Sequence, residues 1–386
     1  MSNSKEQKAS KCSSCGYPGF AGHASDCEYE LDGVEEGGQV EKQDFMQFQE
    51  RDPFGDFMAH IDQGGERREA TQEEEKRMDQ KLLELGRIFD GSGVRWHLDG
   101  ALNVSLQKGE YIGIHKDVDI SVEADDLERL DEHLKKVGYG LFLSQLKDPN
   151  KDESRRILER VDGKAFRQAA EEDDGQRHPT INAIDSTGKI LDDSDLNSID
   201  VHIVRRNEQG NPYGWHGVEL PAKWFEPQSE QLKGVELNLS YPAKVAYFKI
   251  HGTRSYDQTD LYHLAQTKEL TLADVDEIAR VLESEKEIRL DRGRQIFKEI
   301  FQDVTAETQA SEIVDLFLNH PIVGRRTDAV PRFEKIANNI IADKDKSIER
   351  MIDIVINEFA EEAEYKDEKE KLAQLREWCE QSQEKE

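Results

Sequence analysis

Three aspartates lie in two short stretches in which apolar and polar residues alternate. Asp117 and Asp119 belong to HKDVDI (residues 115–120), and Asp200 belongs to SIDVHIV (residues 198–204). In a strand this alternation places both aspartates of the first stretch on one face. Carboxylates on one face repel each other and are costly to desolvate, and a divalent cation relieves both effects. Three acids on adjacent strands would hold two Mg²⁺ ions for phosphoryl or nucleotidyl transfer.

An isolated D-x-D pair has a simpler interpretation, namely a strand edge with solvated carboxylates. The flanking sequence favours the metal site. Residues 94–98 are predicted to form a strand that ends at Gly100, where the missing side chain lets the backbone approach a ligand. A short helix over 101–107 would then present its N-terminus to a phosphate.

The surrounding elements are predicted from their patterns. Thr71-x-x-Glu74 is a capping box and begins a helix that runs to about residue 90. A second amphipathic helix covers 125–136 and a strand covers 139–146. The charged segment 147–175 is predicted to be a partly helical insertion, followed by a hairpin around 185–188.

Downstream, Pro242 suits the first position of a helix that carries Lys244 and Lys249. Either lysine could contact a triphosphate as a point charge. The alternative is a lysine that lays its aliphatic chain along the helix edge. His202 shares a face with Asp200, where it would either lie near the metals or serve as a structural hydrogen-bonding residue.

Together, these motifs resemble the nucleotidyltransferase superfamily with the DNA polymerase beta-like fold. The resemblance rests on Gly100-Ala101, on HKDVDI (115–120), on IDVH (199–202) and on YPAK…FKIH…RSYDQTDL (241–261). Within that superfamily the chain is most similar to the lincosamide and aminoglycoside nucleotidyltransferases and the AbiEii-type nucleotidyltransferase toxins.

The resemblance implies specific roles. The catalytic metal ligands are Asp117, Asp119 and Asp200, which would bind two Mg²⁺ ions. The nucleotide-binding residues are Gly100, Ala101, Lys249 and Arg254. Asp257 and Asp260 are expected to cap or pin a helix, with Asp260 paired to Arg254. In the family, glycine or serine usually follows the glycine, whereas Ala101 has no hydroxyl to offer a phosphate.

Near the N-terminus, three of the four cysteines form the pattern Cys12-x₂-Cys15-x₇-His23-x₃-Cys27. A Cys₃His set at these spacings fits tetrahedral zinc, and glycines between the ligands permit tight turns. The segment is similar to a zinc knuckle with a longer second spacing. The alternative is three free thiols in a flexible tail. Cys379 lies far away in a charged helix and is not expected to take part.

The amino-acid composition indicates which kinds of partner and which cellular compartment to expect. The 386 residues carry a formal net charge of -30, which argues against non-specific nucleic-acid binding. No apolar run is long enough to span a membrane, and no signal peptide is visible, so a cytoplasmic location is expected. Four cysteines in this length do not indicate a disulfide framework.

The predicted fold class is α+β: a nucleotidyltransferase-type mixed sheet flanked by helices, followed by a C-terminal helical bundle. The expected divisions are a zinc-knuckle-like segment (1–30), an acidic flexible linker (31–70), the nucleotidyltransferase domain (71–266) and a helical domain (267–386). The last stretch, 360–386, is almost entirely charged and is expected to be a solvated helix or a frayed tail.

The leading hypothesis is a Mg²⁺-dependent nucleotidyltransferase (EC 2.7.7-like) that moves NMP from an NTP to a hydroxyl and releases pyrophosphate. The acceptor, a small molecule, a protein or a tRNA, is left open. The alternative, favoured by Ala101, is a catalytically degenerate protein with this fold that acts as an antitoxin-like adaptor. A protein partner would bind through the N-terminal knuckle or the C-terminal helices.

Overall fold

The computed structural model describes twelve segments of the chain. They are residues 43–44, 68–115, 118–146, 156–172, 177–191, 198–214, 217–252, 254–267, 269–305, 307–320, 330–358 and 366–384. The four predicted zinc ligands, Cys12, Cys15, His23 and Cys27, lie outside these segments, as does Asp117.

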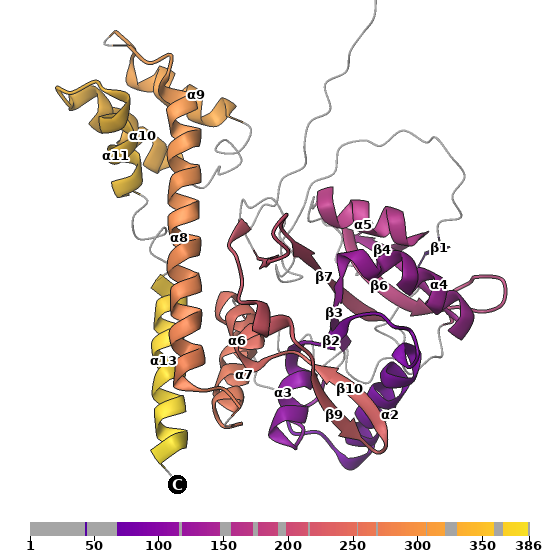
Figure 1. The fold of residues 1–386 in the computed structure, drawn as a ribbon. Coiled ribbons are helices and arrows are strands. Elements are labelled where there is room, and N and C mark those ends of the chain that lie inside the picture. Colours follow the sequence, from indigo (N-terminus) through magenta and orange to yellow (C-terminus); the bar gives the residue numbers. More distant parts are fainter. Residues whose placement is uncertain are drawn as a thin grey trace, which may run out of the picture.

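A mixed sheet forms the centre of the protein (Figure 1). Its strand order is β1-β5-β4-β6-β7-β3-β2-β10-β9, and β8 pairs with β7. The pairs β3·β7 and β2·β10 are parallel, and the other pairs are antiparallel. In chain order the strands are β1 (Gln43–Asp44), β2 (Trp96–Leu98), β3 (Val118–Glu123), β4 (Tyr139–Leu146), β5 (Arg156–Val161), β6 (Arg177–Ala183), β7 (Ile199–Arg206), β8 (Pro212–Tyr213), β9 (Gln228–Leu232) and β10 (Val235–Leu239).

Helices flank this sheet and continue beyond it. The α-helices are α2 (Gln72–Phe89), α3 (Gly100–Lys108), α4 (Leu127–Val137), α5 (Gly163–Glu172), α6 (Pro242–His251), α7 (Ser255–Ala265), α8 (Leu272–Phe301), α9 (Ala310–Asn319), α10 (Val330–Ala342), α11 (Ile348–Glu358) and α13 (Lys366–Glu384). Two 3₁₀ turns are η1 (Ala124–Asp126) and η3 (Ala222–Phe225). As expected, Thr71 and Glu74 form a capping box at the start of α2.

The two faces of the central strands differ in polarity. In β3, Val118, Ile120 and Val122 are buried in the first apolar cluster, which also holds residues of α2, α4 and α5. Each fully buried aliphatic side chain of this kind contributes about 1.5–3 kcal/mol. Asp119 and Ser121 point to the opposite face because side chains alternate along a strand. The α+β class and the mixed sheet are therefore confirmed, and the sheet has one polar face.

A second apolar cluster joins α6, α7, the first half of α8 and α13. It includes Leu375 and Cys379 of α13, which are 0% and 1% exposed. The expectation of a solvated helix or frayed tail at the C-terminus is therefore wrong for this helix. Leu372, Leu375, Trp378 and Cys379 of this helix all belong to the second cluster, on the side that packs against α7 and α8.

The 30-residue helix α8 links two apolar clusters. Its second half, with α9, α10 and α11, forms the third cluster, which lies at the far end of α8 from the sheet (Figure 1). The chain thus has the expected C-terminal helical region. No helix within the described segments is both long and apolar enough to cross a bilayer.

Strand β5 was not predicted. Segment 147–175 was expected to be charged and partly helical, but residues Arg156–Val161 form β5, which pairs with β4 along its whole length. Leu158 and Val161 are three residues apart and therefore lie on opposite faces of the strand, so β5 lacks the alternating pattern that would have predicted it. The helical part of the expectation corresponds to α5.

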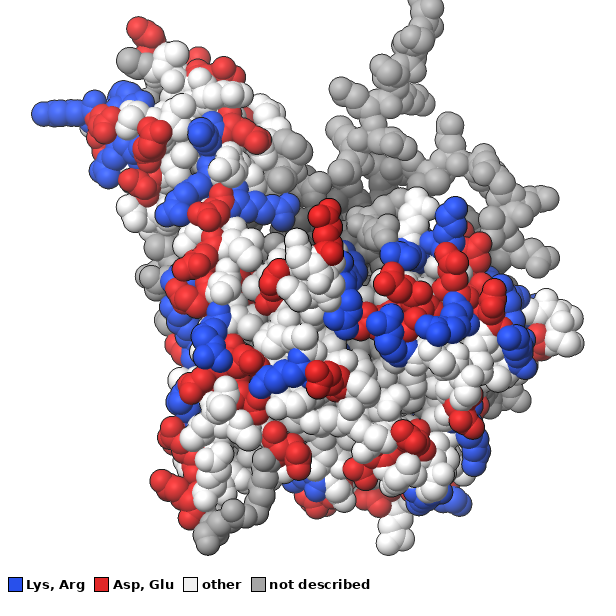
Figure 2. Space-filling model, in the orientation of Figure 1, with Lys and Arg blue, Asp and Glu red and all other residues white. Residues whose placement is uncertain are grey.

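The surface seen in Figure 2 carries basic and acidic side chains that are interspersed. Three arginines pair with buried acids: Arg95 and Arg129 pair with Asp126, and Arg206 pairs with Glu123.

Candidate active site

Asp119 and Asp200 lie side by side on the polar face of the sheet. They are direct partners in the parallel register of β3 and β7, and both are partly buried. Neighbouring strands lie about 4.8 Å apart, so the two carboxylates project from adjacent positions. The structure therefore brings together two of the three predicted acids.

The glycine turn before α3 packs against this pair. The backbone N–H of Asp99 donates to the carbonyl of Asp119 at 2.8 Å. Gly100 has φ +66°, and a Cβ atom there would overlap the Asp119 carboxylate, with Cγ at 3.2 Å. Glycine is favoured at this position both by the left-handed backbone and by the close approach of the Asp119 carboxylate.

Helix α3 begins at Gly100, so its first turn lies beside the Asp119 carboxylate. Its N-cap residue, Asp99, makes no side-chain capping bond, so it leaves the first N–H groups of the helix uncapped. Asn103 ties the helix down by donating to the carbonyls of Leu98 (2.7 Å) and Ser240 (3.1 Å). Ala101, predicted to bind nucleotide, has its methyl group in the second apolar cluster.

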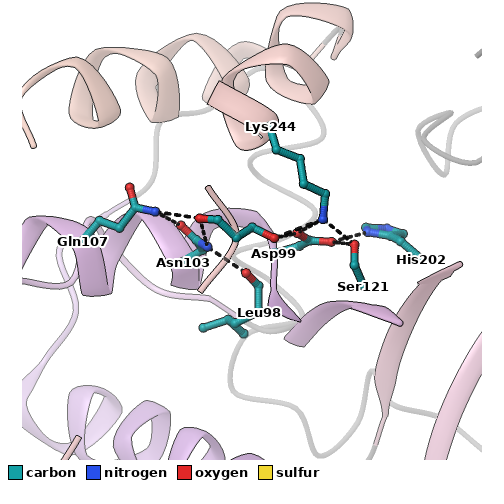
Figure 3. A network of polar contacts seen from close by, with 8 residues as sticks. Leu98, Asp99, Asn103, Gln107, Ser121, His202 and Lys244 are labelled. Atoms are coloured by element: carbon teal, nitrogen blue, oxygen red, sulfur yellow. Dashed lines mark hydrogen bonds and ion pairs between the residues drawn. The ribbon is translucent and has the colours of Figure 1, made fainter. Parts of the chain in front are cut away.

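The side chain of Asp99 is held from four directions (Figure 3). Lys244 Nζ donates to Asp99 Oδ1 at 2.8 Å, and Ser240 Oγ donates to the same oxygen. Ser121 Oγ donates to Oδ2, which also lies 3.2 Å from His202 Nδ1. Burial alone would raise the pKa of Asp99, but the Lys244 charge and the bond to His202 outweigh it and hold that pKa well below its usual range.

Lys244 is committed to this network. It is 1% exposed, and its three N–H groups match three acceptors: Asp99 Oδ1, Ser121 Oγ at 2.6 Å and Ser240 Oγ at 3.0 Å. Of the two lysines that could have contacted a triphosphate, Lys244 therefore lies inside the protein and joins α6 to β3 and to the β2–α3 turn.

Two histidines border the network. Desolvation by neighbouring protein atoms lowers the pKa of His202. The hydrogen bond to Asp99 and the charges of Asp99 and Asp119 outweigh this and raise that pKa above its ordinary value. His97 is buried, and desolvation together with the Lys244 charge lowers its pKa to about 4. His97 is therefore neutral at physiological pH.

Lys249 and Arg254 share a second ionic cluster. Lys249 Nζ lies 2.9 Å from Asp257 Oδ1 and 2.7 Å from Asp260 Oδ2, and both carboxylates are fully or almost fully buried. Arg254 Nε lies 3.3 Å from Asp257 Oδ2, and its guanidinium stacks on Tyr256 with 4.4 Å to the ring centroid. Asp257 caps α7, as predicted, whereas Asp260 pairs with Lys249 rather than with Arg254.

These two cations differ in exposure. The Lys249 side chain is 11% exposed and the Arg254 side chain is 41% exposed. Burial lowers the pKa of Arg254, but the nearby negative charge of Asp257, with a smaller contribution from Asp119, raises it overall. Arg254 therefore carries its positive charge beside the buried carboxylate of Asp257.

Sequence reasoning did not find Asp99, Ser121 or Ser240. A polar residue directly after a buried strand was the available signal: Asp99 follows β2 and Ser240 follows β10, and these two strands are parallel neighbours. Parallel strands end at the same edge of a sheet, so their following residues meet.

The donors present suit a hard divalent cation. Asp119 and Asp200 offer carboxylate oxygens in register, which is the ligand type that Mg²⁺ prefers. Within the described segments, no group of three acidic, histidine or cysteine side chains has the spacing of a metal site. The third predicted ligand, Asp117, lies outside those segments, and so do all four predicted zinc ligands, which stay a prediction.

Comparison with known proteins gives a family match over part of this region. Residues 81–159 match the family described as aminoglycoside-2''-adenylyltransferase. This stretch contains β2, the Gly100 turn, α3 and β3 with Asp119. No curated protein matches the chain.

Two solved structures are similar to parts of the chain. The lincomycin-bound lincosamide antibiotic adenylyltransferase LnuA is 14% identical, with a TM-score of 0.30, over 51% of this chain and 98% of LnuA. An antigenic nucleotidyltransferase-like protein from Paracoccidioides brasiliensis is 13% identical, with a TM-score of 0.31, over 56% of this chain and 90% of that protein.

Proposed function

From the premise that this chain has a nucleotidyltransferase fold related to that of the aminoglycoside adenylyltransferases, we propose that it transfers a nucleoside monophosphate from an NTP to a hydroxyl group. The observation that carries the proposal is the parallel register of Asp119 with Asp200, with Gly100 packed against the Asp119 carboxylate. The activity would reside in residues 71–266, and residues 267–386 would form a helical domain beside it.

In this proposal Asp119 and Asp200, together with Asp117, hold two Mg²⁺ ions. When bound, Mg²⁺ would neutralise phosphate charge and polarise the α-phosphate. The uncapped first turn of α3 donates its N–H groups to phosphate oxygens. Gly100 is required there because any side chain would occupy the space of the Asp119 carboxylate.

The proposed transfer moves one proton, forms one bond to phosphorus and breaks another. Asp200 takes the proton of the acceptor hydroxyl, and the oxygen then forms a bond to the α-phosphorus. The bond from the α-phosphorus to the β-phosphate oxygen breaks, and pyrophosphate leaves. The exposed Arg254 would balance the negative charge on the phosphates, and Lys249 holds Asp257 against Arg254.

The direct test is calorimetric titration of each NTP into the full chain, with and without Mg²⁺. Mg²⁺-dependent binding of one NTP is expected, and Asp119→Asn and Asp200→Asn should each lose it. Asp125→Asn, an acid that is 70% exposed and pairs only with Arg167 among the contacts seen here, is the matched control and should bind like wild type. Mg²⁺-independent binding, or none, would favour the degenerate adaptor instead.

The acceptor would be sought among alcohols, because the proposed reaction needs a hydroxyl. An aminoglycoside and a lincosamide are the first small molecules to test, followed by protein and tRNA acceptors. The zinc proposal is independent: metal analysis of the purified chain should find one zinc per chain, and Cys12→Ser with Cys15→Ser should remove it.

A further inference from the structure

The four bonds to Asp99 determine which nitrogen of His202 carries hydrogen. An ionised carboxylate only accepts hydrogen bonds. Lys244, as an ammonium, donates to Asp99 and to both serine oxygens, so each serine must direct its own hydrogen to Asp99. His202 Nδ1, 3.2 Å from Asp99 Oδ2, must then be a donor as well.

A neutral imidazole with hydrogen on Nδ1 has a lone pair on Nε2. The His202 side chain is 51% exposed, whereas the Asp99 side chain that holds its other nitrogen is 9% exposed. Nδ1 therefore faces the protein and the rest of the ring is open. Within the described part of the chain, the contacts of His202 are made through Nδ1.

The open nitrogen lies on the acid-bearing face. His202 pairs with Ser121 in the β3·β7 register, one pleat along from the pair formed by Asp119 and Asp200. Two residues along a strand span about 6.8 Å and return to the same face. His202 is therefore the next side chain on this face after the acid that would accept the hydroxyl proton.

We infer that Asp99 is a positioning residue, which holds His202 through Nδ1 so that Nε2 faces a substrate hydroxyl on the acid-bearing face of the sheet. The inference rests on the proposed function for the identity of that alcohol, which is either the NTP ribose or the acceptor.

The first test is the tautomer of His202, measured by long-range ¹H–¹⁵N NMR on the full chain at a pH where the ring is neutral. Hydrogen on Nδ1 and a lone pair on Nε2 are expected. His263 is an internal control, because Lys108 Nζ lies 3.0 Å from its Nδ1 and must donate to it, which requires the opposite tautomer. Hydrogen on Nε2 of His202 overturns the inference without any variant.

Asp99→Asn tests the positioning role. The amide can turn its NH₂ group toward His202, which moves the ring hydrogen to Nε2 while the side-chain shape is kept. The expected result is a reversed His202 tautomer with an unchanged His263. If this variant does not fold, Asp99→Asn combined with Lys244→Met removes both buried charges and tests the same point. A His202 tautomer that stays on Nδ1 in either variant contradicts the role of Asp99.

The second test separates the two sources of the hydroxyl. Mg²⁺·ATP, its 2′-deoxy and its 3′-deoxy analogues are titrated into wild type and His202→Phe. A preference of up to about tenfold for ATP over one analogue, lost in the variant, assigns the ribose. Equal binding of all three nucleotides by both proteins excludes the ribose as the source of that hydroxyl. If no nucleotide binds wild type while the Nδ1 tautomer is present, the proposed function fails and the positioning by Asp99 stands.

Discussion

Gly100 packs directly against the carboxylate of Asp119, and its backbone lies in the left-handed region with φ +66°. Gly109 ends the same helix at φ +78°, but nothing lies within 4 Å of where its Cβ would be. The two glycines thus share a backbone requirement and differ in what surrounds them.

Replacing each glycine by alanine separates backbone strain from obstruction of the site. Both variants should lose about 1–2 kcal/mol of unfolding free energy from the left-handed conformation, measured by urea denaturation. Gly100→Ala should lose more, because its methyl group displaces Asp119, and should bind Mg²⁺·NTP at least tenfold more weakly. Gly109→Ala should bind like wild type. Equal nucleotide affinity in the two variants would contradict the proposed position of the site.

The buried pair of Asp99 and Lys244 gives a second prediction. Lys244→Met leaves the Asp99 charge without its main partner, and the expected loss is about 3–5 kcal/mol. Asp99→Asn combined with Lys244→Met removes both charges and should recover most of that loss. Urea denaturation of wild type, Lys244→Met, Asp99→Asn and the double variant forms a double-mutant cycle. Losses that simply add would mean that the two side chains do not stabilise each other.

The sequence was most informative where the signal was local. Alternation within residues 115–120 and 198–204 predicted two strands with their acids on one face, and the register pairs Asp119 with Asp200. Gly100 was predicted from a strand followed by a turn. These features depend on neighbours in sequence and on the fixed period of a strand.

The contacts around Asp99 could not be predicted in this way. Ser240 and Lys244 lie 141 and 145 residues from Asp99 in the sequence, and only the parallel pairing of β2 with β10 brings them together. Lys249 presents the same difficulty, because a lysine on a helix has no local feature that distinguishes a phosphate contact from a bond to a buried aspartate. Tertiary partners decide the roles of such residues.

The contact of α13 with α6 is expected to depend on pH. His251 Nε2 lies 3.1 Å from Glu285 Oε2 of α8, and Nδ1 lies 3.7 Å from Glu368 Oε1 of α13. Tyr247 donates to Glu285, and Lys371 of α13 donates to the carbonyl of Ile250. Burial lowers the pKa of His251, but the two glutamates outweigh it and raise that pKa above 6.5.

The sign follows from this raised pKa. Protonated His251 stabilises the docked helix fully below about pH 6.5, and the stabilisation is lost as pH rises through the folded-state value. Burial raises the pKa of Glu368, but the bond to His251 outweighs it, so the Glu368 contribution is lost only as pH falls through its own lowered value. Amide hydrogen exchange of Lys366–Glu384, corrected for intrinsic rates, should show protection that falls as pH rises above about 6.5.

The amount of protection lost should be about tenfold for each unit by which the folded pKa of His251 exceeds 6.5. His251→Asn should remove the pH dependence, and Glu368→Gln should reduce it. His263→Asn is the matched control: it replaces a histidine on α7, which also packs against α13, and should leave the dependence intact. A His251→Asn protein with the wild-type pH dependence would show that another group titrates.

Lys249 and Arg254 should separate stability from nucleotide affinity. Lys249→Met leaves the buried carboxylates of Asp257 and Asp260 without their shared cation, and a loss of about 3–5 kcal/mol of unfolding free energy is expected.

Arg254→Lys keeps a positive charge on an exposed side chain, so stability should change by less than about 1 kcal/mol. A compact ammonium loses the planar stack on Tyr256 and the two-point contact with phosphate. Arg254→Lys should therefore bind Mg²⁺·NTP about tenfold more weakly, as measured by calorimetry. If instead Lys249→Met folds normally and loses only nucleotide binding, Lys249 contacts the phosphates directly and its bonds to Asp257 and Asp260 are exchanged when the nucleotide binds.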